Sequence, residues 1–129
     1  MREIKFRGWH ERLNKWVYGY YTHCGKLHLI HIDKTYKTGT VEHGGAYEVD
    51  PATVGQFTGL TDKDDNEIYE GDIVAWNDGT PPSPSAVRWD SYYGYFVIME
   101  SLILGHACKT IRVIGNVHDN PDLLEVSHD

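Results

Sequence analysis

Short apolar stretches alternate with polar and glycine-containing stretches along the whole chain, and this pattern predicts a mainly β protein. In the stretch from Ile4 to Trp9, every second side chain would lie on the same face of an extended strand. No long segment of the sequence has the 3.6-residue period of an amphipathic helix. The apolar stretches predict strands at 4–9, 16–21, 27–32, 54–60, 73–76, 92–99 and 111–117.

Residues that favour turns separate these strands and predict two hairpins. The first would join the strands at 4–9 and 16–21. The second would join strands at 86–89 and 92–99 around Asp90 and the serine that follows it. Antiparallel sheets with little helix are therefore expected.

Two longer polar segments are predicted to be loops. The segment 33–45 is polar and rich in glycine, and the segment 77–85 contains prolines, which cannot donate a hydrogen bond within a sheet. Near the C-terminus, Asn120 and Pro121 predict a capped helical turn, with asparagine as the cap and proline at the first helical position.

The length of 129 residues suits a single unit spanning 1–129. We expect an N-terminal β part at about 1–50 and a barrel-like central and C-terminal part at about 51–125. Within the second part, the pattern around 54–118 is typical of an SH3-like barrel, in which a Gly-Asp turn leads into a β-branched strand. The residues expected to form this structural motif are Gly59, Tyr69, Gly71 and Asp72.

The composition limits where the protein is expected to act and which partners it is expected to bind. No apolar run is long enough to span a bilayer, and no apolar segment follows the charged start, so we expect a cytoplasmic protein without a membrane partner. Cys24 and Cys108 are then expected to be free thiols. The net charge of −7 disfavours non-specific binding to nucleic acid. Five basic residues near the N-terminus nevertheless leave a local basic patch open: Arg2, Lys5, Arg7, Arg12 and Lys15.

Three stretches carry more distinctive motifs. They read REIKFRGW at 2–9 followed by WVYG at 16–19, VGQFTGLTDK at 54–63 followed by EIYEGDIV at 67–74, and VIGNVHDNPDLL at 113–124. Together they resemble the YopX family over nearly the whole chain, from residue 2 to about 125. The resemblance implies a mostly β protein encoded by a bacteriophage or prophage, acting in a bacterial host cell, and it carries no catalytic residue.

The chain departs from the family pattern at two places. Asp64, Asp65 and Asn66 stand where the family commonly has Asn-Gly, and His10 stands where an acidic residue is usual. Aspartate and asparagine tolerate the left-handed backbone better than most residues, so we expect the central turn to persist with altered geometry.

Several candidate chemistries find little support in the residue spacing. Asp62 to Asn66 begins like a calcium loop, but Glu67 and Ile73 stand where glycine and glutamate are required, so a solvated hairpin turn is the better interpretation. Glu70 and Asp72 are close in sequence, yet nothing in the sequence indicates burial. The nucleotide-binding glycine motifs and the motifs of serine and cysteine nucleophiles are absent from the sequence.

A cluster of potential metal ligands has residue types that suit zinc, but its spacing fits no standard zinc finger, and His28 and His31 would point to opposite faces of one strand. The cluster consists of His23, Cys24, His28 and His31. No catalytic residue, cofactor or metal ion is therefore predicted.

An aromatic surface is the strongest functional signal. Tyrosine and tryptophan are favoured at protein interfaces, and they also stack on bases in single-strand binders. The candidate interaction surface comprises Trp76, Trp89, Tyr92, Tyr93 and Tyr95. We rank three hypotheses: a non-catalytic accessory protein that binds a host or phage protein or a second copy of itself, a small nucleic-acid-binding β-barrel, and a metal-dependent enzyme.

Overall fold

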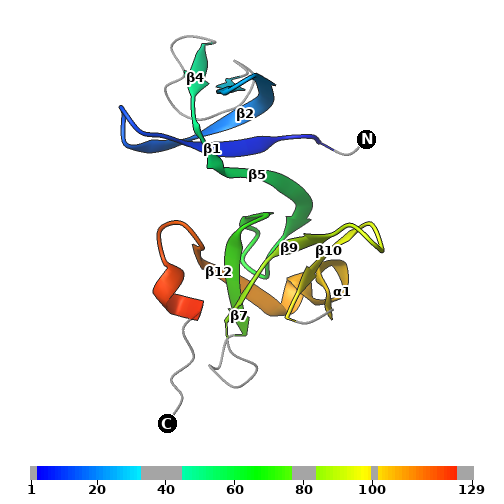
Figure 1. Cartoon of the computed structure of the whole chain (residues 1–129). Coiled ribbons are helices and arrows are strands. Elements are labelled where there is room, and N and C mark those ends of the chain that lie inside the picture. The colour runs from blue at the N-terminus through cyan, green and yellow to red at the C-terminus, as the bar shows by residue number, and fades with distance from the viewer. Residues whose placement is uncertain (1–2, 33–44, 77–83, 100–101, 125–129) are drawn as a thin grey trace. The chain divides into compact units, whose positions relative to one another are not determined.

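The structure is a computed structural model that describes residues 3–32, 45–76, 84–99 and 102–124 (Figure 1). It is mostly β, with small antiparallel sheets, as the alternation of apolar and polar residues predicts. The chain divides into two compact units, Met1–Phe57 and Thr58–Asp129. Each unit has its own core.

The first unit is an antiparallel sheet with the strand order β4-β3-β2-β1-β5. Val17, Ile30 and Val49 form its buried core, and partly buried rings such as Phe6 and Tyr21 pack against them. The strands are β1 (Phe6–His10), β2 (Lys15–Cys24), β3 (Leu27–His31), β4 (Ala46–Glu48) and β5 (Asp50–Thr61).

Strand β5 includes Pro51 because the pairing with β1 is interrupted there. Trp9 pairs with Asp50 and Arg7 pairs with Gly55, so the residues between them bulge out of the ladder. The Thr53 hydroxyl donates to the Asp50 carbonyl and accepts from the backbone N–H of Trp9. The proline thus lies where no ladder hydrogen bond is needed.

The second unit contains two three-stranded antiparallel sheets, with strand orders β11-β10-β9 and β12-β7-β8, and strand β6 beside the end of β5. Its strands are β6 (Glu67–Tyr69), β7 (Asp72–Trp76), β8 (Ser85–Ala86), β9 (Arg88–Asp90), β10 (Tyr95–Ile98), β11 (Leu102–Ile103) and β12 (Ile111–Asn116). The helical elements are α1 (Leu104–Ala107) and the 3-10 turns Cys108–Thr110 and Pro121–Leu124. The core includes Ile68, Val74, Ile98, Leu104 and Ile111.

The Gly-Asp turn that the sequence singles out is a buried structural element. The Asp72 carboxylate is 2% exposed and accepts the backbone N–H of Tyr69 at 2.7 Å. Gly71 has a φ of 91°, which glycine adopts without steric cost, and its backbone N–H donates to the carbonyl of Val87. Gly59 also has a positive φ, of 83°. The burial of Asp72 is a feature that nothing in the sequence indicates.

Several boundaries differ from the predicted ones. The second hairpin is present, but its turn covers residues 91–94. The helix α1 lies between the strands predicted at 92–99 and 111–117, where the sequence predicts no element. Most of the predicted loops at 33–45 and 77–85 lies outside the described residues, and Ser85 at the end of the second one pairs with Val74.

The predicted capped turn at Asn120 is a 3-10 turn, and the Asn120 side chain does not cap it. Its Oδ1 accepts the backbone N–H of Asn116, on the preceding strand, at 3.2 Å. A Cβ atom on Gly115 would lie 2.5 Å from that oxygen, so a side chain at this position would displace the Asn120 amide.

The strands between 54 and 118 form separate small sheets, and their closure into an SH3-like barrel stays a prediction. Among the described residues, no helix combines the length and the apolar character needed to cross a membrane.

Candidate interaction surface

Strands β9 and β10 and the turn between them present most of the nominated aromatic residues (Figure 1). We call residues 88–98 the tyrosine hairpin. Tyr95 pairs with Asp90 and Phe96 pairs with Trp89. Because side chains alternate across a strand, Trp89 and Phe96 share one face of the hairpin and Tyr95 lies on the other.

Asp90 organises the turn of the tyrosine hairpin. Its Oδ1 accepts the backbone N–H of Tyr92 at 2.9 Å and that of Tyr93 at 3.1 Å. Its carbonyl accepts the N–H of Gly94, whose φ is 77°. An aspartate that bonds to the backbone two and three residues ahead is a common device for fixing a turn. Sequence reasoning missed this role, although an aspartate just before a turn that ends in glycine is its usual signal.

The rings at the tip are exposed and contact one another. Tyr92 is 85% exposed and Tyr93 is 63% exposed, and Trp89, on β9 outside the turn, is 46% exposed. The Tyr93 ring stacks on Tyr95 with centroids 5.6 Å apart, and Tyr92 meets Tyr93 edge-on at 4.7 Å. Such ring contacts favour one arrangement of the side chains, and side chains that are already arranged lose less entropy on binding.

The opposite end of the hairpin is anchored in the core. Phe96 and Ile98 are buried among the core residues of the second unit, and the Trp89 ring meets Phe96 edge-on at 4.9 Å. Arg88 donates a hydrogen bond to the carbonyl of Met99, just beyond β10. The exposed rings therefore belong to a hairpin whose other end is packed in the core.

The structure brings four of the five nominated residues together on one hairpin. Trp89, Tyr92, Tyr93 and Tyr95 belong to the tyrosine hairpin. Trp76 lies at the end of β7, opposite Ile111, and packs against the core as a half-buried residue. Trp76 thus contributes mainly to packing.

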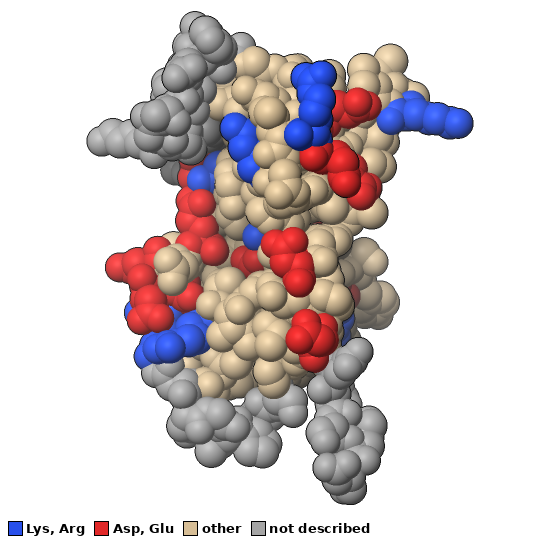
Figure 2. Space-filling view, turned by 90° about the vertical axis from the view of Figure 1, so that its left-hand side faces the viewer, with Lys and Arg blue, Asp and Glu red and all other residues tan. Residues whose placement is uncertain are grey.

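Of the five basic residues near the N-terminus, Arg2 lies outside the described residues, Arg12 and Lys15 are exposed, and the other two are buried. Lys5 is 8% exposed and lies over the Phe57 ring, and Arg7 is 6% exposed and lies over the Trp16 ring. Lys15 is exposed and lies 5.6 Å from the centre of the Tyr47 ring. On the face shown in Figure 2, Lys and Arg side chains stand among Asp and Glu side chains. This arrangement weakens the nucleic-acid hypothesis.

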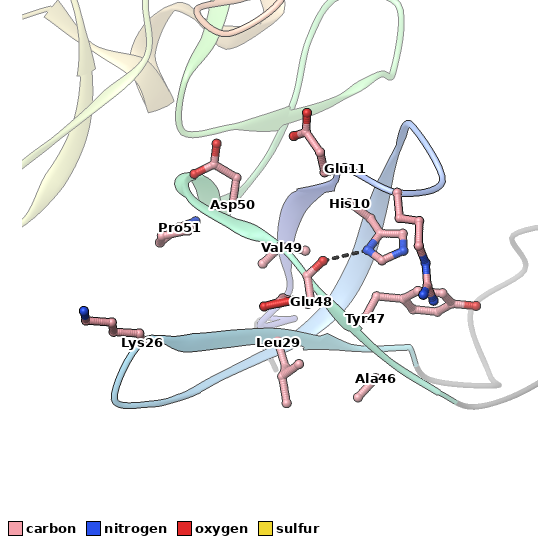
Figure 3. Close-up of a pocket in the computed structure, with 11 residues that line it drawn as sticks. His10, Glu11, Lys26, Leu29, Ala46, Tyr47, Glu48, Val49, Asp50 and Pro51 are labelled. Carbon is pink, nitrogen blue, oxygen red and sulfur yellow. Dashed lines mark hydrogen bonds between the residues drawn. The ribbon is translucent and has the colours of Figure 1, made fainter.

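A hollow of about 720 Å³ lies on the first unit (Figure 3). In Figure 3, the carboxylates of Glu11 and Asp50 point to one side of the β4–β5 segment, whereas Leu29 and Ala46 point to the other. The lining residues are His10, Glu11, Arg12, Lys26, Leu29, Ala46, Tyr47, Glu48, Val49, Asp50 and Pro51.

His10 is the most enclosed of the polar residues that line this hollow. It is 7% exposed, and its Nδ1 lies 2.7 Å from the carbonyl oxygen of Glu48, so Nδ1 carries the proton and donates it. Its Nε2 is buried without a hydrogen-bond partner among the described residues. The ring packs edge-on against Tyr47. His10 thus holds β1 against β4 and is a structural residue.

The potential metal ligands that the sequence analysis weighed lie on different faces of the β2–β3 hairpin. His23 lies directly opposite His28, whereas Cys24 lies opposite Leu27. His31 is on the face opposite to His28, as expected, and bonds to the Thr22 hydroxyl. Among the described residues, no group of three or more His, Cys, Asp or Glu side chains is arranged to hold a metal ion.

Both cysteines belong to the described residues and are free thiols, as predicted. Cys24 is exposed, and Cys108 is buried beside the carbonyl of Gly105.

Comparisons with known proteins agree with the fold. The crystal structure of protein EF1440 from Enterococcus faecalis is similar to this chain, with a TM-score of 0.64 and 23% sequence identity. The similarity covers 97% of this chain and 100% of that chain. No curated protein matches the chain. A family model described as "YopX protein" matches residues 5–125.

Proposed function

We propose that this chain, which belongs to the YopX family, acts by binding another protein through the tyrosine hairpin. The observation that carries the proposal is the exposure of Trp89, Tyr92 and Tyr93 on a hairpin whose base is buried. Large aromatic side chains held rigidly at a surface are typical of the residues that dominate binding energy in protein interfaces. The function is thus that of a non-catalytic accessory protein.

The family resemblance also implies which genomes encode the protein and where it acts, and both are part of the proposal. The protein would be encoded by a phage or prophage and would act in the cytoplasm of the bacterial host. Its partner would be a host or phage protein, or a second copy of the same chain.

The experiment is affinity capture of tagged protein from phage-infected host cells, with half of each sample treated with nuclease. The test variant carries Tyr92→Ser and Tyr93→Ser. The matched control carries Tyr20→Ser, because Tyr20 is also a half-exposed tyrosine (50%) but lies on β2 of the first unit. A protein retained by the wild type and by the control, in both halves, and lost from the double variant would support the proposal.

Two outcomes would contradict it. Capture of the same proteins by the wild type, the double variant and a Trp89→Ser variant would rule out the tyrosine hairpin as the binding surface. Loss of the captured material after nuclease treatment would favour the nucleic-acid alternative, in which the exposed rings stack on bases. That alternative also requires binding to weaken steeply as the salt concentration rises.

A further inference from the structure

We infer that His23 and His28 form a two-imidazole site for a divalent late transition metal ion, with zinc as the ion to test. The inference does not depend on the proposed function, because the site lies on the β2–β3 hairpin of the first unit and the tyrosine hairpin belongs to the second.

The strand register places the two histidines directly across from each other. Gly25 and Lys26 form a two-residue turn, and Gly25 has the positive φ (58°) that such tight turns require at their first position. His23 and His28 are therefore the second pair from the turn.

The backbone hydrogen bonds of β3 show how His23 and His28 are paired in the β2–β3 ladder. The carbonyl of His28 accepts the backbone N–H of Val49, on the side of β3 away from β2. His23 and His28 thus form a non-hydrogen-bonded pair, in which facing side chains come closest in an antiparallel ladder. Their rings are nearly parallel, with centroids 5.2 Å apart and an interplanar angle of 18°.

Tyr21 supports one of the two imidazoles. It is on the same face as His23, its hydroxyl is hydrogen-bonded to Nδ1 of His28, and its ring stacks on His28 at 5.9 Å. When Nδ1 donates its proton to the phenol oxygen, Nε2 of His28 is left with its lone pair for a metal ion. A metal-binding histidine is commonly oriented through its second nitrogen in this way.

The pair is accessible to solvent. His23 is exposed and His28 is half-buried. Zinc binds imidazole nitrogen at about 2.0–2.1 Å, so two nitrogens in a tetrahedral shell lie about 3.4 Å apart. The rings are stacked at 5.2 Å, so the inference requires the exposed His23 ring to rotate and bring a nitrogen that close to Nε2 of His28. Since the described residues provide no third ligand beside the pair, water or a group from another molecule would complete the shell.

The inference is tested by calorimetric titration of Zn²⁺ into the untagged full-length protein in a buffer that does not bind metal. One ion per chain is expected to bind the wild type at this site. His23→Ala and His28→Ala are each expected to weaken that binding at least about tenfold, because one of two protein ligands is lost. His31→Ala is the matched control, since His31 is on the same strand as His28 but on the opposite face.

Tyr21→Phe separates metal binding from simple surface adsorption. It keeps the stacked ring and removes the hydroxyl that orients His28, so it is expected to weaken binding by about 10-fold or more. NMR spectra of the imidazole nitrogens of His23 and His28 should shift when zinc is added. Absence of saturable binding by the wild type, or equal binding by the wild type, His23→Ala and His28→Ala, would overturn the inference.

Discussion

The carboxylate of Asp62 is completely buried and accepts backbone hydrogen bonds from three residues. Its Oδ1 accepts the N–H groups of Asp64 and Asn66, and its Oδ2 accepts the N–H of Val113 on β12. Asp65 follows with a φ of 65°, the left-handed backbone expected for this turn. The segment is thus a turn tied to β12 by a buried side chain, and the expectation of a solvated turn is wrong for Asp62.

The pKa of Asp62 predicts how stability depends on pH. Burial alone would raise this pKa, but the backbone hydrogen bonds from Val113, Asn66 and Asp64 outweigh it and hold the pKa below its ordinary value of 3.8. The unfolded state therefore takes up a proton first as pH falls. The stabilisation is fully present above pH 3.8 and is lost as pH falls through the folded-state pKa.

Asp62→Asn tests this role. The asparagine side chain has only one acceptor oxygen, so its NH₂ group would face either the N–H of Val113 or the N–H groups of Asp64 and Asn66. We therefore expect a loss of about 1–3 kcal/mol in the free energy of unfolding at neutral pH. Urea denaturation at several pH values measures it. The difference in the free energy of unfolding between wild type and variant should shrink as pH falls below 3.8. A difference that does not depend on pH would contradict the lowered pKa of Asp62.

Gly19 is expected to be intolerant of any side chain. A Cβ atom there would lie 2.0 Å from the carbonyl oxygen of His31, which is backbone and cannot move away cheaply. Gly19→Ala should therefore lower the free energy of unfolding by about 1–3 kcal/mol or more. Gly105→Ala is the control, because nothing lies within 4 Å of a Cβ atom at that position. Its effect should stay below about 1 kcal/mol in the same denaturation experiment.

At the scale of single elements, the tyrosine hairpin depends on its turn. Period-two patterning predicts the two strands, but it assigns Tyr92 and Tyr93 to a strand, whereas both belong to the turn. The reason is the Asp90 side chain, which accepts hydrogen bonds from the N–H groups of both tyrosines before the second strand begins. This displacement exposes the two rings.

Asp90→Ala should loosen the turn while leaving the base of the hairpin packed. We expect a loss of about 1 kcal/mol in stability, since the two bonds are partly exposed. Hydrogen exchange followed by NMR should show faster exchange at the amides of Tyr92 and Tyr93, with little change at Val97, which is fully buried. Ser91→Ala in the same turn is the control, and equal effects of the two substitutions would contradict the role of Asp90.

At the scale of the whole molecule, the chain has two cores. The first is built around Val17, Ile30 and Val49, and the second is a larger cluster that includes Ile98 and Leu104. The sequence predicts a division near residue 50, and the structure divides at Phe57 within β5. Strand β5 is continuous through that point, so no break in the apolar pattern marks it.

Substitutions in the two cores should have local effects. Ile30→Ala and Ile98→Ala each remove a fully buried side chain and should cost about 2–5 kcal/mol. In hydrogen exchange followed by mass spectrometry, Ile30→Ala should reduce protection mainly in peptides from residues 3–57. Ile98→Ala should do so mainly in peptides from residues 58–124. Equal loss of protection in both regions from either variant would show that the two cores unfold as one.

The sequence by itself determined the β class, the two hairpins, the free thiols and the family, because these depend on local alternation, turn residues and motifs. It also identified the aromatic residues of the tyrosine hairpin. Tertiary structure alone decided which polar groups are buried, as for Asp62, Asp72 and Lys5, because burial depends on neighbours far away in the chain. It also decided that His23 faces His28 while Cys24 faces away, because a strand's register follows from the conformation of its turn.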